Sequence, residues 1–345
     1  MAKGELTHGI RNIAAQLDVS LAGVGDPGPR LVSACVRKVE AWLDELGPAE
    51  TFEELIEIVA AKLRVHFEVI RSDADVRAIA GRYLKAGETG FATLATTFDN
   101  FTDAAVVRLQ KAPTWSDRKY VAVIDARGAK ASKEWFSKWH ELAHLIAEPQ
   151  MKLAFRRTQA TRRDPVERLM DQIAAELAFY PKLLLPALED FGVDLSAPKL
   201  TKLQTFQNSA LNFASLHATL IAVLRHSPVP AVLIEARMSL KKSEKQALKQ
   251  GSLFDLGTPE QKLRAITTAH NPAAVKHKLF IHQWIRVPER SVIHRLYLGE
   301  ACEFQPVRED LSWWISDGKA LPPRKVVAEA MIAGTGRVLA LITKP

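Results

Sequence analysis

WFSKWHELAHLI, residues 135–146, is the segment that decides the fold expected for this chain. Its apolar residues recur every three or four positions, which is the spacing of an amphipathic helix. Within it, His140 and His144 flank Glu141 in the pattern His-Glu-x-x-His. Histidines four residues apart project from one face of a helix and can bind a single Zn²⁺. We therefore predict a helix over 132–148 that presents two zinc ligands from a packed core.

Glu141 would complete the groups that zinc-dependent hydrolysis requires. Zinc with an open coordination position lowers the pKa of a bound water toward neutrality. Glu141 could take the proton of that water and pass it to a leaving amine, so we predict that it is the catalytic residue. In the alternative interpretation, His140 and His144 are buried histidines that form hydrogen bonds in the core and bind no metal.

The third zinc ligand is expected from the next helix. The segment Asp164-Pro165-Val166-Glu167 has the composition of a helix start. Glu167 is the predicted ligand, and Asp171, one turn later, is predicted to orient a ligand histidine by a hydrogen bond. Glu167 could instead cap the helix by accepting a hydrogen bond from the amide of Asp164. Glu176, nearly opposite on this helix, is a weaker candidate ligand.

Residues 135–146 and 167–177 together resemble the ImmA/IrrE zinc metallopeptidases. That family has an H-E-x-x-H helix led by phenylalanine, and then a helix that bears a glutamate and ends in an apolar segment with proline. The resemblance implies that Glu141 is catalytic and that Zn²⁺ has three protein ligands, namely His140, His144 and Glu167. The chain departs from the family pattern at Asp171, where Asn is usual, and at Phe179-Tyr180-Pro181.

The pattern along the chain predicts an α+β protein. Helices are expected over 31–46, 52–63, 165–180 and, as a pair, 201–225, and strands over 65–70, 90–97 and 120–124. Later strands are expected over 275–287 and 291–298, followed by a hairpin with its turn at 333–336. With the resemblance, four regions are expected: a flexible arm (1–30), a zincin-like metallopeptidase domain with a small mixed sheet (31–188), a helical, helix-turn-helix-like connector (189–228) and a GAF-like sensor domain (229–345).

The resemblance also implies a substrate and a regulatory setting. Radiation-response members of the family cut a helix-turn-helix repressor and so induce genes after DNA damage. A similar protease of CBASS anti-phage operons is thought to respond to single-stranded DNA. By this resemblance, the chain is expected to cut a CapH-like helix-turn-helix repressor and induce a stress or anti-phage operon, with single-stranded DNA as a candidate activator.

In this family the strand before the active-site helix lies at the edge of the cleft. By resemblance, an extended substrate would therefore add as a further strand beside Tyr120, Val121 and Val123. No residue is assigned to stabilise the oxyanion of the tetrahedral intermediate, for which Tyr120 and His66 are two candidates.

The C-terminal third carries most of the net positive charge. Residues 229–345 contain 18 Lys and Arg against 11 Asp and Glu, whereas the whole chain has a net charge of +8. If 275–287 is a strand, one of its faces is basic and aromatic, which suits the phosphates and bases of a single nucleic-acid strand. The predicted binding residues are Lys276, Lys278, Phe280, His282, Trp284 and Arg286. Alternatively, a helix or a partner subunit covers the two aromatic side chains.

The two cysteines, Cys35 and Cys302, are too few and too far apart for a disulfide framework, which favours a reducing, cytoplasmic location. No apolar stretch has the length of a membrane span, so no membrane contact is expected. Either thiol could cap the zinc in a resting state, although Cys35 lies on the apolar face of its helix and is better explained as core.

Two rival functions remain open at this stage. In the first, the chain is a DNA-binding transcriptional regulator with a structural zinc, and it cuts no bond. In the second, the zinc site hydrolyses a substrate that is not a peptide. The predicted helical pair at 201–225 could read duplex DNA, but its apolar residues favour packing between domains.

Overall fold

The computed structural model describes residues 7–98, 102–110, 117–148, 155–158, 164–249, 259–316 and 318–344. The chain forms two compact units, the first of Met1–Pro186 with Phe213–Ser215, the second of Ala187–Asn212 with Leu216–Pro345. Helices and sheets occur in both, so the predicted α+β class is confirmed. The residues expected to form a separate connector, 189–228, fall almost entirely within the second unit.

The first unit begins with helices. They are α1 (His8–Gln16), α2 (Gly28–Leu46), α3 (Phe52–Leu63), α4 (Asp73–Lys85), the 3₁₀ turn η1 (Thr89–Phe91) and α5 (Leu94–Thr97). The helices predicted at 31–46 and 52–63 are confirmed. The expectation of a loosely held arm over 1–30 is wrong in part, because Ile10 and Ile13 of α1 are buried.

A strand was expected over 90–97, and this prediction is wrong. Phe91, Leu94 and Phe98 are all buried in one cluster, three and four residues apart. That spacing is helical. The segment is short and contains three β-branched threonines, which favour a strand, so its local composition indicated the wrong element.

A four-stranded mixed sheet forms the centre of the first unit. Its strands are β1 (Val65–Ile70), β2 (Thr102–Arg108), β3 (Tyr120–Asp125) and β4 (Phe155–Thr158), in the order β1-β3-β2-β4. Strand β3 pairs in parallel with β1 and antiparallel with β2. Both backbone edges of β3 are therefore occupied. The prediction that a substrate adds beside Tyr120, Val121 and Val123 is wrong, because no edge is free there.

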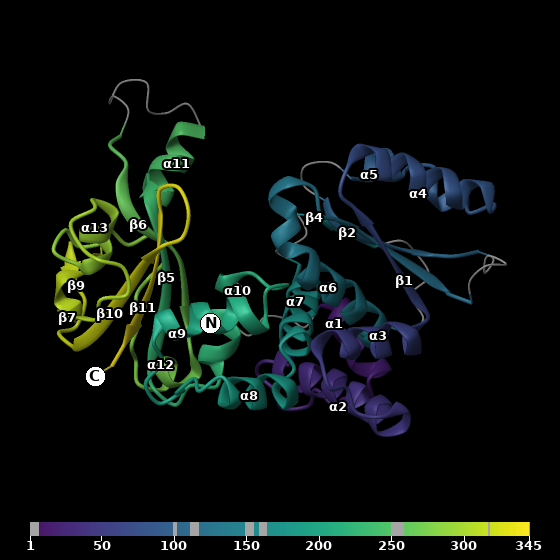
Figure 1. Cartoon of the computed structure of the whole chain (residues 1–345), viewed down its shortest axis with the longest axis horizontal. Coiled ribbons are helices and arrows are strands. Elements are labelled where there is room, and N and C mark those ends of the chain that lie inside the picture. Colours follow the sequence, from purple (N-terminus) through teal and green to yellow (C-terminus); the bar gives the residue numbers. More distant parts are fainter. Residues whose placement is uncertain are drawn as a thin grey trace. The chain divides into compact units, whose positions relative to one another are not determined.

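Helices cover both faces of this sheet (Figure 1). All six residues of β3 are buried, and Val121 and Val123 pack with side chains of α4 and α5 on one face. On the other face, helix α6 (Glu134–Ala147) packs against β2 and β3. A strand covered on both faces reads as a continuous apolar run, as YVAVI at 120–124 does.

Helix α6 is followed by α7 (Pro165–Ala178) and α8 (Pro181–Asp190). The helices predicted at 132–148 and 165–180 are confirmed. Trp139 of α6 is fully buried, and the indole nitrogen of Trp135 donates to the carbonyl oxygen of Ala178 over 3.2 Å. These contacts fix α6 against α7, the second helix from which a metal ligand was expected.

The second unit is built around a five-stranded antiparallel sheet. Its strands are β5 (Ala231–Ser239), β6 (Lys262–His270), β7 (Val307–Asp310), β10 (Lys325–Ile332) and β11 (Arg337–Thr343), in the order β6-β5-β11-β10-β7. The predicted closing hairpin is confirmed as β10 and β11. In its turn, Gly334 and Gly336 have φ of 104° and 66°, which favours glycine.

Helices and short strands complete this unit. They are α9 (Leu200–Ala210), α10 (Leu216–Arg225), α11 (Lys242–Lys249), α12 (Pro272–Lys276), α13 (Val292–Tyr297), the 3₁₀ turn η4 (Leu311–Trp313), β8 (Ile315–Ser316) and β9 (Lys319–Ala320). The pair α9 and α10 confirms the two helices predicted over 201–225. None of the described helices is both long enough and apolar enough to cross a bilayer.

The strands expected over 275–287 and 291–298 are wrong. Asn271 caps α12 by accepting a hydrogen bond from Ala274 N (2.7 Å), and Ser291 caps α13 by accepting one from Ile293 N (3.3 Å). Asn and Ser are residue types that commonly start helices, so Asn271 and Ser291 are the sequence features that indicate helices here. Alternating burial does persist in the irregular segment 279–287, whose buried residues are Leu279, Ile281, Ile285 and Val287.

Candidate metal centre

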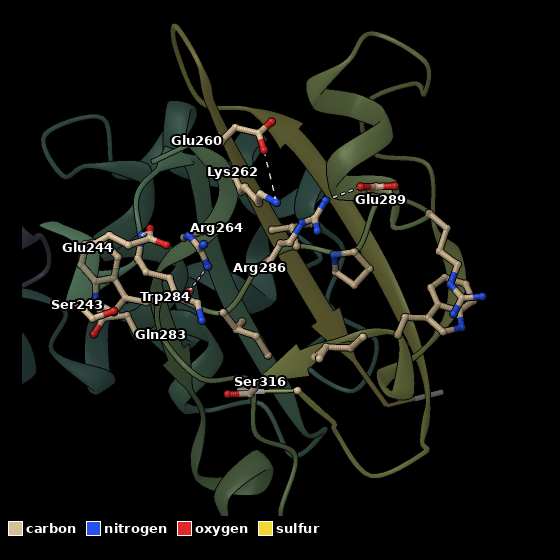
Figure 2. Close-up of a pocket in the computed structure, with 18 of the residues that line it drawn as sticks. Ser243, Glu244, Glu260, Lys262, Arg264, Gln283, Trp284, Arg286, Glu289 and Ser316 are labelled. Carbon is tan, nitrogen blue, oxygen red and sulfur yellow. Dashed lines mark hydrogen bonds and ion pairs between the residues drawn. The ribbon is translucent and has the colours of Figure 1, made fainter. Parts of the chain in front are cut away.

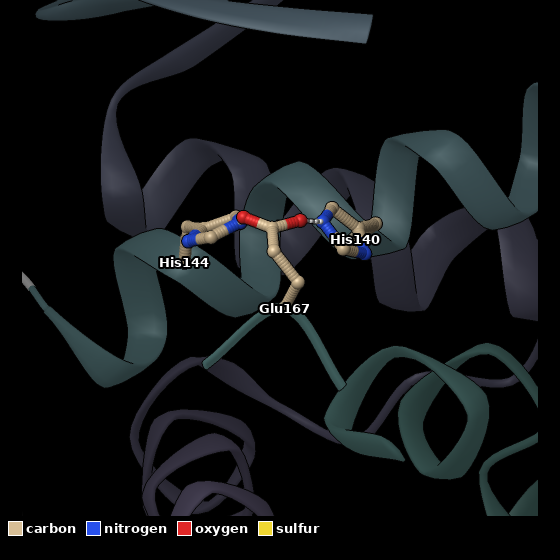
Figure 3. Close-up of side chains that lie close together, drawn as sticks. All are labelled: His140, His144 and Glu167. Carbon is tan, nitrogen blue, oxygen red and sulfur yellow. Dashed lines mark hydrogen bonds and ion pairs between the residues drawn. The ribbon is translucent and has the colours of Figure 1, made fainter. Parts of the chain in front are cut away.

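Three side chains from two helices meet in the first unit. His140 and His144 come from α6, and Glu167 comes from the first turn of α7. Figure 3 shows the Glu167 carboxylate between the two imidazole rings. The two Nε2 atoms are 3.2 Å apart, His140 Nε2 lies 3.2 Å from Glu167 Oε2, and His144 Nε2 lies 3.5 Å from Glu167 Oε1.

Each of these separations is close to the distance between two ligand atoms of a tetrahedral zinc ion, and the two that involve Glu167 end on different oxygens of its carboxylate. Bonds of about 2.0 to 2.2 Å from zinc to nitrogen or oxygen, at tetrahedral angles, place neighbouring ligand atoms about 3.3 to 3.5 Å apart. The three side chains therefore approach one another as closely as ligands of one zinc ion do, with one carboxylate oxygen of Glu167 directed at each histidine (Figure 3). Three protein ligands leave the fourth corner for water or substrate.

The site is buried, and its chemistry calls for a cation. His140 and His144 are 0% and 1% exposed, and Glu167 is 7% exposed. An anionic carboxylate and the lone pairs of two imidazoles are costly to bring together away from water unless a positive charge lies between them. A divalent metal ion supplies that charge, so the residues fit a metal site. The group can bind a metal ion.

Asp171 lies beside His140, as the sequence predicted. Its Oδ1 atom is 2.9 Å from Nδ1 of His140. An ionised carboxylate only accepts hydrogen bonds, so this contact favours the proton of His140 on Nδ1, which would leave the Nε2 lone pair directed at His144 and Glu167. The carboxylate of α7 thus selects the tautomer that can bind a metal.

The capping alternative for Glu167 does not describe the structure. Asp164 caps α7 with its own side chain, which accepts a hydrogen bond from Val166 N over 2.7 Å. The carboxylate oxygens of Glu167 instead face the histidines. Glu176 is not part of the metal-binding group among the described residues.

Glu141 is 1% exposed and lies on α6 between the two histidines in sequence. Its catalytic role stays a prediction, as do the oxyanion roles of Tyr120 and His66. The Nε2 atom of His66 lies 3.3 Å from Glu68 Oε1 on the same strand, β1. Tyr120 is buried at the start of β3.

Two contacts to α6 escaped the sequence analysis. Lys38 of α2 donates from Nζ to the carbonyl oxygen of Ile146 over 2.9 Å, at the last turn of α6. This ammonium satisfies a carbonyl that the helix leaves without an internal partner and opposes the negative end of the helix dipole. The second contact is the indole of Trp135, described above. Neither contact could be predicted, because no local sequence pattern indicates which distant carbonyl oxygen a lysine or a tryptophan will contact.

The cysteines are not part of the metal-binding group in the described part of the chain. Cys35 of α2 is fully buried, and burial is the main cause that raises the pKa of its thiol to about 12, although Lys38 nearby acts in the opposite direction. A protonated, buried thiol is a poor metal ligand, so Cys35 fits the core role. Cys302 is exposed in the second unit.

The predicted nucleic-acid residues do not form one face of a strand. Lys276 ends α12, while Lys278, Phe280 and His282 are exposed in the irregular segment that follows. Trp284 and Arg286 differ from these four because they line a cavity of the second unit.

Known proteins provide no independent assignment for this site. No protein-family model matches the chain, and no curated protein matches it significantly. The geometry of His140, His144 and Glu167 is therefore the observation on which a function has to be based.

Proposed function

We propose that the first unit is a zinc-dependent endopeptidase. The observation that supports this most directly is the grouping of two histidine Nε2 atoms, 3.2 Å apart, with the Glu167 carboxylate, whose Oε2 lies 3.2 Å from His140 and whose Oε1 lies 3.5 Å from His144. A structural zinc would ordinarily have four protein ligands. Among the described residues this group has three, which favours a catalytic site with one open position.

The side chains would divide the chemistry as follows. His140, His144 and Glu167 hold the ion, which when bound supplies Lewis acidity to a carbonyl and a water of lowered pKa. Glu141 accepts the proton of the attacking water on its carboxylate and returns it to the leaving amine. Asp171 keeps the proton of His140 on Nδ1, so that Nε2 stays available as a ligand.

The proposed substrate is a helix-turn-helix repressor of the CapH-like kind, and the proposed outcome is induction of a stress or anti-phage operon in the cytoplasm. This part rests on the resemblance of residues 135–146 and 167–177 to the ImmA/IrrE metallopeptidases. Single-stranded DNA is the proposed activator, supported by the excess of positive charge over residues 229–345.

Strand addition, if the substrate uses it, must avoid β3. In the described sheet, β1 and β4 are the outermost strands, each paired on one side. An extended repressor segment would therefore pair its backbone with one of these two strands.

The test is cleavage of purified helix-turn-helix repressors, including one encoded next to this chain, with products identified by mass spectrometry. We expect the zinc-loaded protein to cut one of them, with single-stranded DNA added if needed. Glu141→Gln should bind zinc normally and cut at least about 100-fold more slowly, because the proton acceptor is lost. Glu134→Gln, on the same helix, should keep activity.

The rival functions give different results in this assay. A DNA-binding regulator with a structural zinc would leave every repressor intact, and Glu141→Gln would change nothing. A zinc hydrolase with another substrate would leave the repressors intact but consume a small amide in a manner that depends on Glu141.

A further inference from the structure

The second unit contains a cavity of about 1180 Å³. Its lining comes from α11, from β6, from the irregular segment 283–290, from Trp313 of η4 and from β8. Figure 2 shows side chains of both charges and the ring of Trp284 around it. Typical sites for small ligands have about 300 to 1,000 Å³, so this cavity could hold one or two nucleotide-sized groups.

Arg264 is the most unusual residue of this lining. It belongs to β6 and is only 5% exposed, yet it is charged and faces the cavity. Its Nε atom donates to the carbonyl oxygen of Ser239 over 3.2 Å, and Nη1 donates to that of Trp284 over 3.3 Å. A guanidinium has five N–H donors, so three are left without a protein acceptor among the described residues.

The charge of Arg264 is not neutralised by an ion pair within the described part of the chain. Burial is the main cause that lowers its pKa, the carboxylate of Glu244 opposes this effect, and Arg286 adds to it. Two other cations of the cavity do have carboxylate partners. Lys262 lies 3.5 Å from Glu260, and Arg286 pairs with Glu289. A buried, unpaired guanidinium with donors to spare is a site that an anion would stabilise.

Trp284 is held in place at the wall of the same cavity. Its backbone has φ of 71°, an uncommon value for a bulky residue. Hydrogen bonds on both sides impose it, because Trp284 N donates to Ala265 O over 2.6 Å and Trp284 O accepts from Arg264. Strain of this kind persists where the surroundings fix it and is concentrated at functional sites. The partly exposed indole, with Lys245 Nζ 4.6 Å from its ring centre, offers a flat surface on which a base can stack.

We propose that this cavity binds a nucleoside phosphate, with the phosphate at Arg264 and the base against Trp284. Arginine is suited to phosphate because its planar fork donates two parallel hydrogen bonds. A free nucleotide and the phosphorylated end of a single DNA strand present the same base and phosphate, and binding measurements with each distinguish the two sources. The proposal stands independently of the peptidase activity, since it concerns binding to the second unit alone.

Calorimetry on the full chain at low salt tests the proposal, with dAMP, deoxyadenosine, inorganic phosphate and a 5′-phosphorylated ten-nucleotide single strand as probes. We expect dAMP to bind at least about tenfold more tightly than deoxyadenosine or phosphate alone, because only dAMP uses both subsites. If the strand binds and dAMP does not, the strand end is the ligand and the 5′-hydroxyl strand should bind about tenfold more weakly.

Two pairs of variants assign the binding to this cavity. Arg264→Gln should lower the affinity for dAMP by at least about tenfold and leave that for deoxyadenosine unchanged, and Trp284→Leu should lower both. The controls are Lys202→Gln and Phe191→Leu, a cation and an aromatic residue of the second unit outside the cavity lining, which should stay within about twofold of the parent affinity. If Arg264→Gln does not fold, as judged by circular dichroism, Trp284→Leu decides. The proposal is overturned if none of the nucleotides binds at millimolar concentration, or if the controls lose as much affinity as the cavity variants.

Discussion

Asp171 accepts a hydrogen bond from Nδ1 of His140 over 2.9 Å, so an aspartate of α7 sets the protonation of a histidine of α6. Removing this acceptor should weaken metal binding, because the ring loses both its orientation and its fixed tautomer. We expect Asp171→Ala to lower zinc affinity about 10-fold to 100-fold, and Asp171→Asn, which keeps an acceptor oxygen, to lower it less. Competition with a coloured chelator measures both.

Glu176→Gln is the matched control for Asp171, because it removes a carboxylate from the same helix without touching the metal group. Its zinc affinity should equal that of the parent protein. An unchanged affinity for Asp171→Ala would show that the hydrogen bond to His140 does not support the metal.

Zinc should stabilise the first unit against unfolding. A ligand that binds only the folded state at 100 times its Kd adds about 2.7 kcal/mol to the free energy of unfolding. We expect excess zinc to raise the Tm of the unit and a chelator to reverse the shift. Glu167→Gln should abolish most of this zinc-dependent shift, because the ligand set loses its anionic oxygen.

Asp164→Ala, measured by the same zinc-dependent unfolding experiment, distinguishes capping of α7 from metal binding by Glu167. It removes the side chain that caps α7, which should cost about 1 kcal/mol with or without zinc. The zinc-dependent rise in Tm should therefore remain. If Asp164→Ala lost that rise and Glu167→Gln kept it, the assignment of Glu167 as the ligand would be refuted.

The two cysteines should differ in reactivity. Burial raises the pKa of Cys35 to about 12, so its thiol stays protonated at pH 8, while Cys302 is exposed. A thiolate reagent at pH 8 should therefore modify one thiol per folded chain and two in denaturant. The Cys302→Ser variant should show no fast reaction. Fast modification of Cys35 in that variant would contradict its place in the core.

Asp125 should make the stability of the first unit depend on acid pH. It is 2% exposed, and its oxygens accept from Arg127 Nε and Lys130 Nζ, each over 2.8 Å. Burial alone would raise the pKa of this carboxyl, but hydrogen bonds from these two cations outweigh that effect and hold the pKa below its usual value. The stabilisation is therefore present above the unfolded pKa of about 4 and is lost as pH falls toward the folded value.

Asp125→Asn should lower the free energy of unfolding by about 1 to 2 kcal/mol at pH 7, because Arg127 and Lys130 lose a buried anionic acceptor. Arg127 keeps Asp73 as a partner, and Lys130 keeps the carbonyl oxygen of Thr102. The difference from the parent protein should shrink as pH falls below about 4, since the parent carboxyl then takes up a proton. Denaturant titrations at both pH values measure this. The exposed Asp44→Asn is the control and should change stability by less than about 0.5 kcal/mol. A gap that stays constant with pH would contradict the prediction.

Gly9 tests whether α1 is docked onto α7. A Cβ at this position would lie 2.6 Å from Cγ2 of Val166. Alanine normally favours a helix by about 1 kcal/mol over glycine, yet Gly9→Ala should destabilise the unit because the two helices must move apart. Gly9→Ala combined with Val166→Ala should recover the loss. Gly25→Ala, where no atom lies within 4 Å of the added Cβ, should be neutral, and equal effects at both glycines would argue against docking.

Local patterns predicted the elements that depend on local causes. The helix of residues 134–147 follows from its apolar spacing, and the start of α7 follows from Asp164 and Pro165. The metal group could be anticipated because two of its members lie one helical turn apart and the third lies in the first turn of the next helix. The short helix α13 differs from the predicted strand, because the cap at Ser291 starts a helix in a segment whose apolar residues also suit a strand.

Relationships between distant segments could not be predicted in the same way. Whether β3 lies at an edge depends on which strands pair with it, and β2 contributes a partner that the sequence analysis did not identify. Arg264 and Trp284 are twenty residues apart, and a bend in the chain joins them through a side chain to backbone hydrogen bond. Hydrophobic patterning reports burial, but it does not report which backbone groups meet.

The central position of β3 affects how readily the structure around the candidate metal centre opens to solvent. A strand paired on both sides and covered on both faces opens to solvent only when most of the surrounding unit opens, so its amides should be among the slowest to exchange with deuterium. Helix α6 packs directly on this strand. The two histidines therefore lie on a helix that packs against the strand expected to exchange most slowly. Glu167 lies in the first turn of α7, and helix ends open more readily than buried strands, so a bound ion should be lost first by opening at that turn.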